Sequence, residues 1–212
     1  EEDIFSPEYF EKLSDIKMPA TKLEILVKMM RKQIREYSKV NQLAAKTFER
    51  MLEDTIRAYH ERRKHLSIEE AGEAQEQASD DIIKAAYDHA LEVLRQMKES
   101  RESFRKIGLT FEEKAFYDIL LALRDQYDFE YGTDKEVDGV VINDKCKALA
   151  QKVKEIIDTK SSFADWLNNQ NVRNQLKLEI KICLVKNGYP PRYSPEVFKK
   201  VMEQVENFEE NN

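Results

Sequence analysis

The sequence is poor in cysteine and in the residues that interrupt regular structure. Five glycines and five prolines among 212 residues fall below the roughly 12% that average usage of the two residues predicts. No two glycines are close enough to form the GxGxxG or GxxxxGK loops that bind nucleotide phosphates. The two cysteines, Cys146 and Cys183, are too few and too far apart for a zinc knuckle or a CxxC pair. A reducing compartment therefore fits best.

Long hydrophobic runs are also absent. No apolar stretch approaches the ~18 residues that span a bilayer, and the N-terminal residues Glu1, Glu2 and Asp3 are acidic where a signal peptide is basic. We therefore expect a soluble, intracellular protein with no membrane partner. The chain begins at Glu1 without a methionine, which indicates a piece of a longer polypeptide.

Charged residues, by contrast, make up 36% of the chain, above the usual ~25%, and together with the scarcity of glycine and proline they predict helix. Helix starts are marked by capping boxes, in which a Ser or Thr and a Glu three residues later satisfy free backbone N–H groups, and by Ser-Pro pairs. Gly108 and Gly188 mark helix ends. The starts are Ser6-Pro7, Thr21 with Glu24, Ser67 with Glu70, Thr110 with Glu113, and Ser194-Pro195.

A heptad seam runs through the first part of the chain. Apolar or small residues recur at alternating steps of three and four from Leu23 to Ala58, with Asn41 and Thr55 filling the gaps. A helix unbroken from Thr21 to about His65 would need another long helix beside it, and residues 68–106 continue the period. We predict a long antiparallel helical hairpin over residues 21–107. The seam alone also allows an unrelated, self-associating coiled-coil protein.

The remaining segments complete an all-α prediction. Residues 1–20 are expected to form an N-terminal lead-in, and residues 108–212 a C-terminal helical bundle packed with the hairpin in one overall domain. Residues 125–144 carry seven acids against Lys135 alone and contain Gly132 and Gly139, so we expect an acidic, solvated loop there.

Positive charge is concentrated in one stretch of an acidic protein. Residues 28–65 hold eleven Lys or Arg against five acids, a net charge of +6, although the whole chain carries −6. The favoured interpretation is that this stretch faces the acidic residues 66–81 or the solvent. The alternative is a strip that contacts DNA phosphates in a salt-dependent way, formed by Arg57, Arg62, Arg63 and Lys64.

A second basic stripe and a single tryptophan are the other candidate contacts. Arg173, Lys177 and Lys181 recur every four residues and so share one helical face. A solvated amphipathic face is favoured over contact with nucleic acid or an acidic partner. Trp166 is most simply a core anchor, and an exposed Trp166 would instead be a partner contact.

No catalytic set can be assembled from the sequence. His60 and His65 are five residues apart, which places their side chains ~140° apart around a helix, so they cannot share a metal ion. His89 stands alone on its helix. We assign no catalytic residue, no cofactor-binding residue and no metal ligand to this chain.

A series of short motifs follows in a fixed order along the second half of the chain. The motifs are Gly108-Leu109-Thr110-Phe111-Glu112-Glu113, Ala115-Phe116-Tyr117-Asp118, Asp165-Trp166, Val172-Arg173 and Lys186-Asn187-Gly188-Tyr189-Pro190-Pro191. This series resembles the C-terminal helical domain of the restriction (R) subunit of type I restriction-modification enzymes. The stretch from Arg57 to Arg63 also resembles an earlier helix of that domain.

This resemblance implies a parent subunit that is an ATP-dependent DNA translocase and endonuclease, with ATP and Mg²⁺ as cofactors. The nuclease and motor motifs of such a subunit are not in this sequence, so this fragment is expected not to be an enzyme. The resemblance implies that the region docks the R subunit onto the modification methyltransferase core, in the cytoplasm of a bacterium or archaeon. Double-stranded DNA is the alternative partner, contacted by a guiding element beside the motor.

Overall fold

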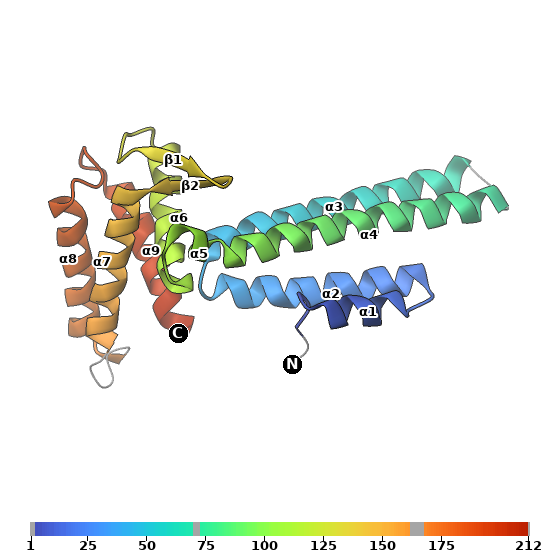
Figure 1. Ribbon diagram of the computed structural model, residues 1–212, viewed down its shortest axis with the longest axis horizontal. Coiled ribbons are helices and arrows are strands. Elements are labelled where there is room, and N and C mark those ends of the chain that lie inside the picture. The colour runs from blue at the N-terminus through green and yellow to red at the C-terminus, as the bar shows by residue number, and fades with distance from the viewer. Residues whose placement is uncertain (1–2, 70–72, 162–167, 212) are drawn as a thin grey trace. The chain divides into compact units, whose positions relative to one another are not determined.

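The computed structural model describes residues 3–69, 73–161 and 168–211, which confirm an all-α fold with one small β-hairpin (Figure 1). These residues fall into two compact units. The first comprises Glu1–Tyr37 and Ala45–Ser100, and the second Ser38–Ala44 and Arg101–Asn212. The elements are α1 (Pro7–Ser14), α2 (Pro19–Ser38), α3 (Gln42–Glu69), α4 (Glu73–Glu102), α5 (Phe104–Ile107), α6 (Phe111–Gln126), β1 (Asp134–Val137), β2 (Val140–Asn143), α7 (Asp144–Ser161), α8 (Gln170–Lys186) and α9 (Pro195–Asn211).

The first unit is built from α1, α2, α3 and α4. Helices α3 and α4 run antiparallel beside each other, and α2 lies along them (Figure 1). Helix α2 buries one residue at every third or fourth position, as an amphipathic helix should. One contact cluster joins Leu23 of α2 to Ile83 and Ala86 of α4. The buried residues of α2 are Leu23, Leu26, Met30, Ile34 and Tyr37.

The heptad seam does not form one unbroken helix through residues 21–65, because the chain turns between α2 and α3. Asn41 is 2% exposed and acts as the N-cap of α3, accepting a hydrogen bond from the backbone N–H of Ala44 at 3.0 Å. Its amide donates to Asp118 Oδ2 at 2.7 Å. Asparagine is a strong helix cap. Asn41, which the sequence places within the heptad seam, therefore precedes the first turn of α3. The long antiparallel hairpin is formed by α3 and α4, and α2 precedes it as a separate helix (Figure 1).

Helix α9 stabilises this turn through the backbone carbonyls that α2 leaves free. Asn207 Nδ2 donates to the carbonyl of Ser38 at 2.9 Å, and Gln204 Nε2 donates to the carbonyl of Val40 at 3.0 Å. The last carbonyls of a helix have no partner within the helix. Two side chains of α9 satisfy two of the carbonyls at this turn, which makes residues 38–44 part of the second unit.

The second unit packs α6, α7, α8 and α9 around one hydrophobic core. Its helix α6 begins with the predicted capping box, since Thr110 Oγ1 accepts from the N–H of Glu113 at 3.1 Å and Glu113 accepts from the N–H of Thr110 at 2.9 Å. Ser6 caps α1 as predicted. Thr21 and Ser67, in contrast, lie inside α2 and α3 rather than at their starts. The largest fully buried core residues of this unit are Phe116, Tyr117, Leu120, Leu123 and Tyr189.

The predicted acidic loop over residues 125–144 is wrong in its second half, which forms an antiparallel β-hairpin. Strand β1 pairs with β2 from Asp134 opposite Asn143 to Val137 opposite Val140. Asp138 and Gly139 connect the strands with φ values of 51° and 77°, the positive values that a tight two-residue hairpin turn requires. Among the described helices, none is long and apolar enough to cross a membrane.

Candidate functional site

The basic strip predicted on α3 does not form a single surface. Helical steps of ~100° per residue place Arg62 and Arg63 on different faces from Arg57. Arg57 pairs with Asp54 at 3.0 Å. Arg63 donates to the hydroxyl of Tyr59 at 3.2 Å, with its guanidinium 5.5 Å from the centre of the Tyr59 ring. Lys64 is exposed on the last turns of the helix.

The second basic stripe, on α8, lies against α9 and the segment before it. The ammonium group of Lys177 forms an ion pair with Glu206. The ammonium group of Lys181 lies 5.6 Å from the ring centre of Tyr193 and 5.4 Å from that of Phe198. Two of the three residues of the stripe therefore make contacts within the second unit.

The third member of that stripe, Arg173, faces a buried acid. Glu209 of α9 is 6% exposed, and its Oε1 atom has no hydrogen-bond partner among the described residues. Burial raises the pKa of Glu209 to about 7, and the positive charge of Arg173 opposes part of that rise. Trp166, the remaining sequence candidate, lies outside the described residues.

A groove that the sequence did not predict as a site lies between α2 and α3 within the first unit, with a volume of about 540 Å³. Its floor is apolar and its rim is basic. The floor is formed by Leu23, Val27, Ile56, Tyr59 and Ala86, and the rim by Lys28, Arg31, Arg35, His60 and Arg63, with Glu24 as an acidic member.

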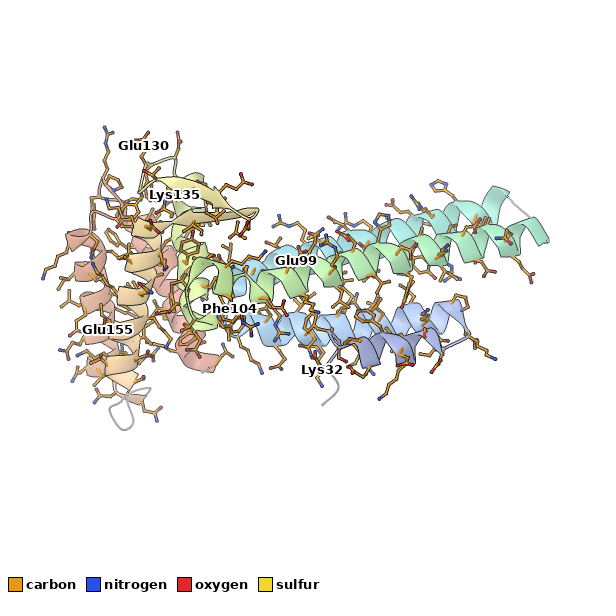
Figure 2. All side chains as sticks on the ribbon, viewed as in Figure 1. Lys32, Glu99, Phe104, Glu130, Lys135 and Glu155 are labelled. Carbon is orange, nitrogen blue, oxygen red and sulfur yellow. The ribbon has the colours of Figure 1, made fainter. Side chains whose placement is uncertain are left out.

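The charges on this rim are only partly neutralised within the chain. Arg31 pairs with Glu53 at 3.1 Å. Lys28 and Arg63 form no ion pair with a described residue. Charged side chains project widely from the helices of this unit, including the labelled Lys32 and Glu99 (Figure 2). The sequence does contain a signal for the rim, because Lys28, Arg31 and Arg35 recur at steps of three and four and so share one face of α2.

Helix α3 is incompletely packed beside this groove. Its buried residues Ala45, Phe48 and Leu52 all lie in its first half, and none of residues 53–66 is buried. A second cavity of about 240 Å³ lies on the other side of the same stretch, between α3 and α4. Protein interiors are normally close-packed, so this stretch presents surface that the rest of the unit does not fill.

An apolar stripe on α8 is the other exposed surface of note. Leu178, Ile182 and Val185 are 57%, 43% and 57% exposed. Their spacing of four and three residues places them on one face of the helix. Contiguous exposed apolar surface marks contact sites more often than single exposed residues do. This stripe belongs to the second unit.

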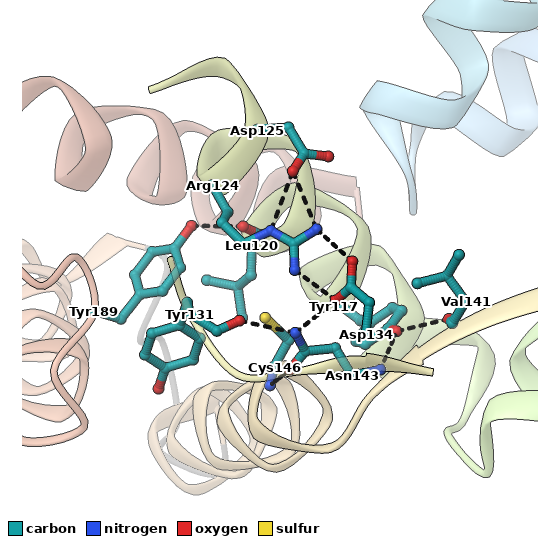
Figure 3. Close-up of polar contacts among 10 residues, drawn as sticks. All are labelled: Tyr117, Leu120, Arg124, Asp125, Tyr131, Asp134, Val141, Asn143, Cys146 and Tyr189. Carbon is teal, nitrogen blue, oxygen red and sulfur yellow. Dashed lines mark hydrogen bonds and ion pairs between the residues drawn. The ribbon is translucent and has the colours of Figure 1, made fainter. Parts of the chain in front are cut away.

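A buried polar network in the second unit joins the hairpin to α6 and α7 (Figure 3). Asn143 is fully buried, and its amide donates to the carbonyl of Tyr131 at 2.8 Å and to Asp134 Oδ1 at 2.9 Å. Its Oδ1 accepts from the N–H of Cys146 at 3.0 Å, which caps α7. The hydroxyl of Tyr117 accepts from the N–H of Asn143 at 3.0 Å. One asparagine thus fixes the strand, the loop and the helix together.

The same network continues through an arginine and a tyrosine. Arg124 of α6 holds Asp134 with two hydrogen bonds of 2.6 Å and 2.8 Å, and this contact keeps the pKa of Asp134 below its usual value. The hydroxyl of Tyr189 donates to the carbonyl of Leu120 at 2.8 Å. Gly188 follows the end of α8, as the sequence predicts. Tyr189 anchors this end of the helix to α6, and the network is structural.

This network offers no activated nucleophile. Burial raises the pKa of the Cys146 thiol to about 12, so the thiol stays protonated and unreactive at neutral pH. Burial likewise raises the pKa of Tyr131 to about 12. Residues 3–69, 73–161 and 168–211 contain no group of three or more His, Cys, Asp or Glu side chains that could hold a metal ion.

Comparison with known proteins gives a consistent set of relatives. A family model described as "Type I restriction enzyme HindI endonuclease subunit-like, C-terminal" matches residues 1–211. A protein of Methanocaldococcus jannaschii, named as a putative type I restriction enzyme MjaIXP endonuclease subunit, is 25% identical over 185 residues. The type I restriction enzyme HindI endonuclease subunit of Haemophilus influenzae is 28% identical over 181 residues.

The match covers most of this chain but a small part of each relative. It spans 87% of the chain and 15% of the archaeal protein, and 84% of the chain and 14% of the bacterial protein. No solved structure matches the chain.

Proposed function

Because the chain belongs to the family formed by the C-terminal regions of type I restriction endonuclease subunits like that of HindI, we propose that it is an assembly domain. In this proposal, it docks the ATP-dependent translocase and nuclease of its parent subunit onto the modification methyltransferase core of the same system. The docking takes place in the cytoplasm of a prokaryote, during DNA restriction. The names of the relatives support a place in a multi-subunit restriction enzyme, because both proteins are called endonuclease subunits.

The observation that carries the proposal is the unfilled surface along α3. A 28-residue helix extends about 42 Å, yet among its described side chains, residues 42–66, those that are buried all lie in the first half. The second half borders cavities on both sides and carries exposed cations. A surface of this kind fits contact with another subunit.

In this proposal, catalysis lies elsewhere in the parent subunit. The matched region is only 14–15% of the two relatives, so most of each relative lies outside it. We propose that the nuclease and motor functions, with their ATP and Mg²⁺, belong to that remaining part. The chain itself then contributes binding energy and positioning but no chemical step.

A second candidate function is DNA guidance beside the motor. The net charge of +6 over residues 28–65 favours it, as do the exposed side chains of Arg57, Arg62 and Lys64. Contacts between cations and DNA phosphates weaken steeply as salt rises. Duplex DNA binding that disappears between low and moderate salt would therefore support this second function. The idea of an unrelated coiled-coil protein is set aside, because the chain belongs to the restriction subunit family.

The test is co-elution of the chain with the cognate methyltransferase core on a sizing column, with and without a DNA duplex, at low and moderate salt. Docking predicts a complex that forms without DNA and persists at moderate salt. A complex that needs DNA and is lost as salt rises would replace docking by DNA guidance. Free elution of both proteins under every condition would show that docking resides elsewhere in the parent subunit.

A further inference from the structure

We infer that the groove between α2 and α3 receives an acidic amphipathic helix of the methyltransferase core. This inference rests on the docking function proposed above and names the surface that performs it. The groove lies within one unit of the structure, with walls from two antiparallel helices and a volume of about 540 Å³. Grooves between helices commonly bind an amphipathic helix through its apolar face.

The floor of the groove determines the apolar side of the partner. Leu23, Val27 and Ile56 lie along it, and Val27 and Ile56 are only half-buried. Apolar surface of this kind gains free energy when another apolar surface covers it. A partner helix with leucine-like residues every three or four positions would supply that cover.

The rim determines the charge of the partner. Lys28 stands on the α2 wall and Arg63 on the α3 wall, and neither forms an ion pair with a described residue. Arg31, also on the α2 wall, shares its charge with Glu53. Carboxylates along both edges of the incoming helix would pair with these cations, and charge complementarity of this kind favours correct partners over wrong ones.

An amphipathic helix fits this groove better than duplex DNA does. A DNA duplex offers phosphates but little apolar surface, so it would contact the cations of the rim and leave the half-buried Val27 and Ile56 uncovered. An α-helix is about 10–12 Å across with its side chains, which suits a channel between two neighbouring helices. It would also pack against residues 53–66 of α3, none of which the chain itself buries fully.

The experiment compares two charge-reversal variants of equal charge. Lys28→Glu with Arg63→Glu changes both walls of the groove. Lys84→Glu with Lys98→Glu makes the same change in net charge on exposed residues of α4 outside the groove. All four side chains are exposed, so both variants should fold, and circular dichroism melting checks this. The affinity for the purified core is measured by biolayer interferometry, alongside binding of a labelled duplex.

The groove variant should bind the core at least about tenfold more weakly than the native chain, because like charges now face each other across the interface. The control variant should stay within about twofold, as expected for exposed charges outside a contact. If both variants bind as the native chain does, the groove inference is overturned while docking stands. If the groove variant loses DNA binding but keeps the core, the groove belongs to DNA and the inference is again overturned.

A photo-crosslinker at Ile56 provides an independent measurement that does not depend on altered charge. It should join the chain to a core peptide that is acidic and has apolar residues at helical spacing, whereas a crosslinker at Lys84 should not. Crosslinking to a second copy of this chain, or to a basic segment of the core, would contradict the inference. If the native chain does not bind the core at all, the proposed function fails and this inference fails with it.

Discussion

Replacing Asn143 by alanine should destabilise the second unit by about 3 kcal/mol. The change removes the N-cap of α7, which is worth about 1 kcal/mol. It also leaves the carbonyl of Tyr131 without its side-chain partner, in a site where Asn143 is fully buried. Each buried group left unsatisfied costs about 1–3 kcal/mol, so the total exceeds that of an ordinary cap.

A matched control is available in the same unit. Asn169 caps α8 by accepting from the N–H groups of Asn171 and Val172 at 3.1 Å and 3.3 Å, but it is exposed to water. Water can replace its hydrogen bonds, so Asn169→Ala should cost about 1 kcal/mol or less. The free energy of unfolding is measured by guanidinium chloride titration followed by circular dichroism. If Asn143→Ala and Asn169→Ala lower the free energy of unfolding by amounts that agree within about 0.5 kcal/mol, the argument that burial increases the cost of a lost cap is refuted.

Three further changes test other parts of the structure. Gly132→Ala should lower the melting temperature in a thermal scan, because Gly132 has φ of +66° and an added Cβ would lie 2.2 Å from Asn143 Oδ1; an unchanged midpoint would contradict this contact. Asn41→Ala should cost about 2 kcal/mol in a denaturant titration, through the lost cap of α3 and the lost bond to Asp118; a loss under about 0.5 kcal/mol would exclude the capping role. Burial raises the pKa of Glu209 from 4.5 to about 7, so the folded chain binds this proton more tightly than the unfolded chain does. Stability should therefore fall as pH rises from about 4.5 to about 7, and Glu209→Gln should reduce that slope in melting scans across this range; an equal slope in both proteins would contradict the buried carboxyl.

Local signals in the sequence predicted much of the fold. The capping residues Ser6 and Thr110 set the starts of α1 and α6, because each bonds to a backbone group three residues away. The left-handed glycines Gly108 and Gly188 follow helix ends with φ of 78° and 69°. Interactions of this range depend only on neighbouring residues, so a single sequence suffices to find them.

The errors arose where distant residues decide the local structure. In the sequence, the place of Asn41 in the heptad seam is compatible with a continuous helix. Its hydrogen bond to Asp118, 77 residues away, is visible only in the structure. The hairpin turn at Asp138-Gly139 has a clear sequence signal. The acidic residues around it favoured a loop, and the hairpin is anchored by long-range bonds such as that from the hydroxyl of Tyr117 to the carbonyl of Val141.

The candidate surfaces were harder to predict than the fold. The density of positive charge from Arg57 to Lys64 suggests a single basic strip in the sequence. Consecutive residues of a helix point in different directions, however, so these side chains do not share one face. The rim of the groove combines Lys28 of α2 with Arg63 of α3. Only the turn at Asn41, which makes these two helices neighbours, brings those two cations to the same groove.

Docking onto the methyltransferase core is tested most directly by competition in the complete restriction enzyme. Excess chain is added to the core before the native endonuclease subunit, and DNA cleavage, ATP hydrolysis and methylation are followed in parallel. Docking predicts that the chain occupies the core, so that cleavage and DNA-stimulated ATP hydrolysis fall with increasing chain while methylation continues. Undiminished cleavage at a chain concentration far above that of the endonuclease subunit would contradict the docking role.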